Sequence, residues 1–108
     1  MKPTMIDAKI LPAIAAERDR LIRLRHDLHA HPELAFDEHR TSERVAEFLA
    51  AAGIDVHRGL AGTGVVGVLR VGQSDAAIGL RADMDALPLT ELNEFAHCSR
   101  HPGRMHAC

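Results

Sequence analysis

The sequence has 108 residues, of which 46% are hydrophobic and 26% are charged. That length allows one small domain that buries roughly two thirds of its unfolded surface, and the composition is typical of a folded globular protein rather than a disordered chain. The 13 basic and 15 acidic residues give a net charge of −2. Without a strong positive field, we expect neither nucleic acid nor an anionic membrane as a partner.

Hydropathy and cysteine content indicate the cellular compartment of the protein. No apolar run near Met1 has the length of a signal peptide, and no later stretch approaches the ~20 apolar residues that span a bilayer. We therefore expect a cytoplasmic protein whose two cysteines are thiols, ligands or packing residues rather than a disulfide.

Apolar spacing predicts two helices in the first half of the chain. A long amphipathic helix is expected from Ile10 to Leu28, with Pro12 in its first turn and an end at 31–32, since the residue before a proline avoids helical geometry. A second helix carries apolar residues at i, i+3, i+4 and i+7, and Gly53 is placed as its C-terminal cap. The residues of that apolar face are Val45, Phe48, Leu49 and Ala52.

The pattern after the second helix is that of strands. Residues 54–60 and 65–71, joined by a glycine turn, predict an antiparallel pair. A third strand is expected at 76–82, and its nearly unbroken apolar start indicates burial on both faces. The order predicts an α/β fold in which two helices are followed by three strands of a mixed sheet. Two helices cover only one face of a sheet, so the layers should be unfinished.

Two carboxylates follow the third predicted strand. Asp83 and Asp85 would stand just past its C-terminal end, where open α/β sheets usually place their ligands. Such groups can bind a metal or orient a ligating imidazole. Capping of the following turn is an equal alternative on spacing alone.

Histidines and cysteines form two further groups. In the first, His26, His29 and His31 lie at a predicted helix end, where capping and loop anchoring are favoured over joint ligation. The second could form a small self-contained metal-binding module, but no pair of ligands with zinc spacing has a matching second pair, which favours a solvated loop. Its members are His97, Cys98, His101, His106 and Cys108.

Four stretches in this order resemble the metal-dependent amidohydrolases of the aminoacylase, hippurate hydrolase and indole-acetyl-amino-acid hydrolase group. They read LRHDLHAHPELAF at 24–36, GTGVVG at 62–67, IGLRADMDALP at 78–88 and GRMHAC at 103–108. The resemblance covers nearly the whole chain after Leu21. It implies that residues 1–108 are the N-terminal portion of a catalytic domain, without the lid that carries dimer contacts.

The resemblance also implies a site and a reaction. Cys108 would be a ligand between two divalent ions, which could be zinc, manganese, cobalt or nickel, while His106 would not be a ligand. Asp85 would support the site, and Cys98 matches no family ligand. The expected reaction is metal-assisted hydrolysis of an N-acyl amino acid such as hippurate, with a glutamate as general base.

In the family, that glutamate and the remaining ligands follow the segment that matches Cys108. The 108-residue chain alone is therefore expected to be inactive, and a homodimer is expected only for the complete enzyme. The metal-binding module and an inert remnant remain as alternatives.

Overall fold

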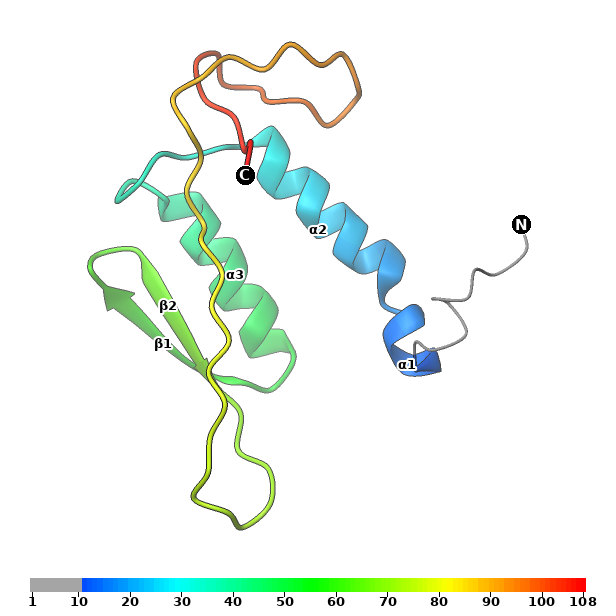
Figure 1. The fold of residues 1–108 in the computed structure, drawn as a ribbon, viewed down its shortest axis with the longest axis vertical. Coiled ribbons are helices and arrows are strands. Elements are labelled where there is room, and N and C mark those ends of the chain that lie inside the picture. Colours follow the sequence, from blue (N-terminus) through cyan, green and yellow to red (C-terminus); the bar gives the residue numbers. More distant parts are fainter. Residues whose placement is uncertain (1–10) are drawn as a thin grey trace.

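The computed structural model describes residues 11–108 and confirms an α/β fold (Figure 1). In chain order the elements are α1 (Pro12–Ala15), α2 (Arg18–Ala30), α3 (His39–Ala51), β1 (Asp55–Leu60) and β2 (Gly64–Val68). After β2 the chain makes a loop, then crosses in front of α3 in this view as an extended segment, and finally loops over the C-terminal end of α2 and finishes there (Figure 1). Among residues 11–108, no helix has the length and apolarity needed to cross a bilayer.

The first helix was predicted as one unit and is instead two. Its start at Ile10 lies outside the described residues, α1 ends at Ala15, and α2 begins at Arg18. The prediction of continuity was wrong because Ile14 and Leu21, on the supposed apolar face, are 57% and 46% exposed, so this face lacks a packing surface among residues 11–108. The predicted end is confirmed, since α2 stops at Ala30.

The second helix and its cap match the prediction. Gly53 follows α3 with a φ of 77°, and its N–H donates to the carbonyl of Ala50 at 3.0 Å. That left-handed conformation favours glycine because a Cβ would crowd the backbone.

The hairpin confirms the predicted antiparallel pair. Asp55 pairs with Val68, and His57 pairs with Val66. A Cβ built on Gly67 would lie 2.9 Å from Cγ2 of Ile54 and 3.3 Å from Cδ1 of Leu49. Glycine at this position therefore lets the hairpin and α3 approach closely.

The third predicted strand is not a strand. Residues 76–82 are extended but unpaired, and the sheet that the structure describes has two strands, both antiparallel, rather than three in a mixed arrangement. Ile78 and Leu80 are 91% and 96% exposed, so the predicted burial was also wrong. The apolar pattern requires a neighbouring strand and a covering layer, and nothing within 11–108 supplies either.

Two isolated bridges hold the C-terminal part of the chain. Leu34 pairs with Ala86 in parallel, and Leu87 pairs with Met105 in antiparallel fashion. Among the described residues the buried apolar side chains are small, namely those of Ala30, Pro32, Ala46 and Ala86. The apolar core is therefore minimal, in keeping with an incomplete domain.

Candidate functional site

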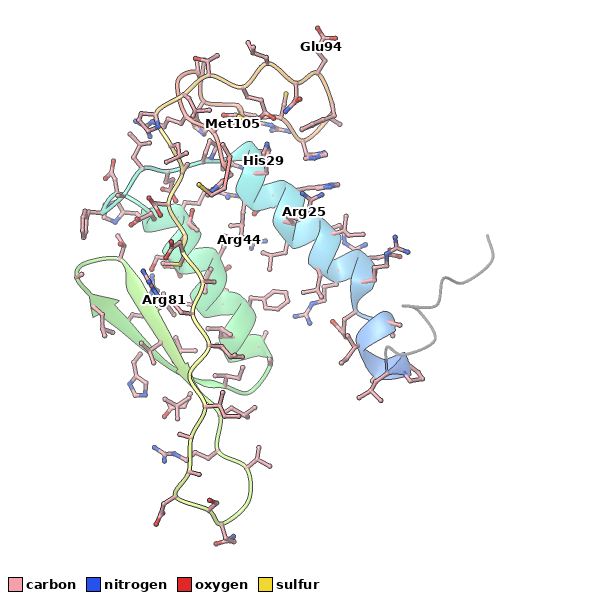
Figure 2. All side chains as sticks on the ribbon, in the orientation of Figure 1. Arg25, His29, Arg44, Arg81, Glu94 and Met105 are labelled. Atoms are coloured by element: carbon pink, nitrogen blue, oxygen red, sulfur yellow. The ribbon has the colours of Figure 1, made fainter. Side chains whose placement is uncertain are left out.

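The predicted site residues Asp85 and Cys108 come from segments that the structure joins. Leu87 and Met105 exchange two backbone hydrogen bonds, of 2.9 and 3.0 Å. Asp85 precedes Leu87 by two residues, and Cys108 follows Met105 by three. Their side chains are both exposed. The bridge thus brings the two segments to one end of α2, where Met105 lies close to His29 in Figure 2.

A cavity of about 1040 Å³ opens beside these segments. Cys108, His106, Asp83 and His29 line it together with apolar side chains of α3 and the hairpin. Those apolar residues include Val45, Leu49, Ile54 and Val65. Asp85 is not part of this lining, so the structure places it beside the cavity rather than in its wall.

His106 has an unused ring nitrogen next to this cavity. Its Nε2 is buried and has no hydrogen-bond partner among the described residues. Burial lowers the pKa of His106, and the neighbouring His29 adds to this effect, while the charge and backbone of Asp85 partly oppose it. The imidazole is therefore held neutral, with one nitrogen free to accept or donate.

Asp83 does not join a cluster of carboxylates. It pairs with Arg81 at 3.0 Å, and both side chains are largely exposed. The structure contains no side-chain hydrogen bond that would make Asp83 or Asp85 a turn cap within residues 11–108. The contact that the structure gives Asp83 is therefore the exposed ion pair with Arg81.

The first histidine group anchors a loop, as expected from its place at a helix end. The Nε2 of His29 lies 3.0 Å from both carboxylate oxygens of Glu91, and Nδ1 of His31 lies 2.9 Å from the carbonyl of Asp27. Glu91 also accepts the N–H of Ser99 at 2.6 Å. Sequence reasoning missed Glu91 because no local pattern connects residues that lie 62 positions apart.

Glu91 is strongly acidic in this position. Burial acts to raise its pKa, but hydrogen bonds from Asn93, His29 and Ser99 outweigh burial and lower the pKa to about 2. Its side chain is only 3% exposed. A buried, ionised carboxylate with three donors is a firm anchor for the loop between the two bridged residues Leu87 and Met105.

The second histidine group does not form a metal module. The ring of His97 stacks on His26 at 3.6 Å and on Phe95 at 4.0 Å, and His101 lies by His31, with 5.9 Å between ring centroids. Across residues 11–108 no three histidine, cysteine or acidic side chains are grouped in a way that could hold an ion. These contacts explain the histidines as loop anchors.

Behind the site lies a polar hub, which sequence reasoning also missed. It consists of Asp27, Glu33, Glu38, Arg40, Thr41 and Thr63. Glu33 accepts the N–H of Arg40 at 3.0 Å, the N–H of Thr41 at 2.5 Å and the hydroxyl of Thr41 at 2.7 Å. It therefore caps α3 from outside the helix. Its backbone carbonyl accepts the N–H of Ala86 at 2.7 Å, which ties the cap directly to the segment that carries Asp85.

The other hub contacts connect the helices and the hairpin. The hydroxyl of Thr63 donates to Glu38 at 2.5 Å, with both residues buried. Asp27 on α2 accepts from Arg40 on α3 at 2.7 Å, although Nη1 of Arg40 has no partner among the described residues. The hub is thus a chain of polar contacts from α2 through α3 to the hairpin turn.

These contacts lower the pKa of each hub carboxylate. For Asp27 the largest cause is the hydrogen bond from Arg40. For Glu33 and Glu38 burial acts in the opposite direction, and hydrogen bonds from Thr41 and Thr63 respectively lead the effects that overcome it. All three groups are therefore ionised at neutral pH.

Comparison with known proteins gives consistent relatives. The chain is 46% identical over 99 residues to the hippurate hydrolase of Campylobacter jejuni, covering 92% of this chain and 26% of the relative. It is 41% identical over 90 residues to IAA-amino acid hydrolase ILR1-like 5 of Arabidopsis thaliana, covering 83% of this chain and 20% of that protein. A comparison with protein-family models finds no match.

A solved structure is also similar to this chain. The YXEP protein of Bacillus subtilis, described as a dinuclear metal binding peptidase from the M20 family, superposes with a TM-score of 0.82 at 37% identity. The match covers 87% of this chain and 26% of that protein. The chain therefore spans about a quarter of the length of the relatives that it matches.

Proposed function

Because this chain belongs to the metal-dependent amidohydrolase family that includes hippurate hydrolase and the M20 peptidases, we propose that it supplies Cys108 and Asp85 to a two-metal centre. The complete protein would hydrolyse the amide bond of N-acyl amino acids, with hippurate-like compounds as the central substrate class. The observation that carries this proposal is the Leu87–Met105 bridge, which brings together the two segments that hold Asp85 and Cys108.

The donor groups fit part of such a centre. A thiolate at Cys108 suits zinc, cobalt or nickel, and carboxylate oxygens also suit manganese. When bound, the two ions would lower the pKa of a water and polarise the amide carbonyl. Within this chain, Cys108 would bind the ions, while Asp85 would orient a neighbouring ligand by hydrogen bonding.

The surroundings of the site support these roles. Cys108 lies in the wall of a cavity that an N-acyl amino acid could enter, and the apolar side chains of that wall suit the acyl group. Asp85 stands at the margin of the same cavity, close enough for its charge to act on the imidazole of His106. A supporting carboxylate would occupy such a place.

The proposal extends to the part of the protein that this chain represents. Residues 1–108 would form the N-terminal portion of the catalytic domain of a cytoplasmic enzyme, with the lid and the homodimer contacts elsewhere. One thiolate and one carboxylate cannot complete a two-metal centre, so the 108-residue chain by itself would be inactive.

A chimaera tests the proposal. This chain would replace the 99-residue matching segment of the Campylobacter jejuni hippurate hydrolase, and benzoate release from hippurate would be measured with and without added Zn²⁺ or Mn²⁺. We expect metal-dependent activity. Cys108→Ser should abolish it, and Asp85→Asn should reduce it by roughly ten- to a hundredfold, as for other groups that orient metal ligands.

Cys98 provides the matched control. It is a thiol in the same region but matches no ligand, so Cys98→Ser should leave the activity of the chimaera unchanged. An active chimaera that tolerates Cys108→Ser contradicts the ligand assignment. A folded but inactive chimaera favours the inert-remnant reading, and hydrolysis by the 108-residue chain alone overturns the predicted inactivity.

A further inference from the structure

Three stacked rings fasten the loop between Leu87 and Met105 to α2. His97 of the loop lies between Phe95, at 4.0 Å and 17°, and His26 of α2, at 3.6 Å and 6°. His29 contacts the edge of His97, with 5.7 Å between the centroids. The N–H of Arg100 completes the attachment by donating to the carbonyl of Ala30 at 2.9 Å.

The two faces of His97 are covered by the rings of Phe95 and His26. Protonation of His97 would therefore place a positive charge where water has little access. Arg25 increases this penalty, because its guanidinium lies 3.3 Å from Nε2 of His26. Arginine can only donate, so Nε2 of His26 is the acceptor in this contact.

The charged groups around the stack are unevenly distributed. Arg25, His26 and His29 face His97 from α2, and Glu91 faces it from the loop. Glu91 is committed to His29, with both oxygens at 3.0 Å, and His106 lies on the other side of His29 at 6.4 Å between centroids. Glu91 therefore favours a proton on His97 only weakly, less than His26, His29 and Arg25 oppose it.

We propose that the Phe95–His97–His26 stack is a pH-sensitive latch, which holds the loop at 91–101 against α2 at neutral pH and releases it when His97 is protonated. Release would expose His29, which lines the cavity beside Cys108. The latch depends on the loop and α2 alone and does not require the proposed hydrolase activity.

The direction of the effect follows from the environment of His97. Burial lowers its pKa from the ordinary value of 6.5, and the nearby His26, His29 and Arg25 lower it further. Because the attached loop binds fewer protons than the released loop, the attachment is strongest above about pH 6.5 and weakens as pH falls below that value. Glu91, with a pKa of about 2, stays ionised throughout this range.

Amide hydrogen exchange on the 108-residue chain tests the latch. The Arg100 N–H reports attachment, and the Ser42 N–H, which donates to the carbonyl of Glu38 at 2.9 Å, serves as the reference in α3. After correction for intrinsic exchange, we expect protection of Arg100 to fall about three- to tenfold between about pH 7 and pH 5.5, while that of Ser42 stays constant.

Phenylalanine substitutions separate protonation from stacking. His97→Phe keeps an aromatic ring in the stack but cannot be protonated, so protection of Arg100 should no longer depend on pH in this range. His39→Phe, at a residue that is exposed outside the loop, should behave as the unmodified chain. The proposal is overturned if Arg100 is unprotected at pH 7, if its protection follows that of Ser42, or if the pH dependence survives His97→Phe.

Discussion

The polar hub and the open apolar side of this chain are organised in opposite ways. In the hub, Glu33, Glu38 and Thr63 are mostly or fully buried and hydrogen-bonded to partners within the chain. On the open side, Leu69, Val71, Ile78 and Leu80 are between 69% and 96% exposed. The chain thus contains the directional contacts that specify its geometry but little of the apolar burial that normally stabilises a domain.

This difference shows where stability should be sensitive. Removing a hub contact leaves a buried donor or acceptor unpaired, which is costly whatever the size of the apolar core. Changing an exposed apolar side chain removes almost no buried area. Four predictions, from the largest expected effect to the smallest, test this comparison.

Acid should disrupt the hub more than any single substitution. The folded-state pKa values of Asp27, Glu33, Glu38 and Glu91 all lie below their ordinary values, that of Glu91 at about 2. Each ionised group therefore stabilises the fold above about pH 4.5, and that contribution is lost as pH falls through the folded-state pKa. Circular dichroism should show helical structure retained at about pH 5 and lost between about pH 4 and pH 2. A helical signal that persists unchanged at pH 2 contradicts this account.

Glu33→Ala should be the most damaging hub substitution. It removes the acceptor for two backbone N–H groups at the start of α3 and for the buried Thr41 hydroxyl. We expect a loss of about 2–3 kcal/mol in the free energy of unfolding, measured by urea titration. Glu43→Ala is the matched control, because Glu43 forms only an exposed ion pair with Arg58 at 2.9 Å and should cost less than about 1 kcal/mol. Equal losses for the two variants would contradict the prediction that hub contacts stabilise the fold more than exposed ion pairs do.

Thr63→Val should have an intermediate effect. It keeps the side-chain shape but deletes the hydroxyl that donates to Glu38. The carboxylate of Glu38 still accepts the N–H of Phe36 at 3.0 Å, so we expect a loss of about 1–2 kcal/mol. The double variant with Glu38→Gln should lose less than the sum of the single losses, since Thr63→Val removes and Glu38→Gln weakens the same contact. Additive losses would indicate that Thr63 and Glu38 act separately.

Charge on the open side should change stability least. Ile78→Glu combined with Leu80→Glu should alter the unfolding free energy of the 108-residue chain by no more than about 0.5 kcal/mol, because these side chains are almost fully exposed. The same pair in the hippurate hydrolase chimaera should prevent folding if that protein covers this surface. Urea titration of both proteins makes the comparison, and a large loss in the short chain would show that residues 76–82 are packed.

Local sequence patterns predicted the elements that depend on local interactions. The end of α2 before Pro32, the second helix with Gly53 behind it and the β1–β2 hairpin follow from chain geometry within a few residues. The third strand failed because pairing depends on a neighbour distant in sequence. The prediction of one continuous first helix failed for a similar reason, since an amphipathic helix requires a surface on which to pack.

The candidate site also contains residues that the sequence pointed to and contacts that it did not predict. Spacing alone left Asp83 and Asp85 between ligand and turn cap, and only the resemblance suggested Cys108 as a ligand, which stays a prediction. The contacts that support the site were not predicted, because a carboxylate such as Glu33 or Glu91 carries no sign in the sequence of which distant N–H or imidazole it will meet. Apolar periodicity reports burial, whereas polar pairing is a property of the folded chain.

The Leu34–Ala86 and Leu87–Met105 bridges have a consequence for synthesis on the ribosome. The helices and the hairpin can form as soon as they emerge, since their contacts are local. The segment that carries Asp85 can dock only after Ala86 has appeared, about half the chain after its partner, and its other edge waits for Met105. Closure of these loops is the slow, entropically costly part of folding. Among residues 11–108, the segments that carry Asp85 and Cys108 should therefore be the last to become ordered during translation. A pause shortly before Met105 emerges would leave a nascent chain with the helices and the hairpin formed but without the Leu87–Met105 bridge.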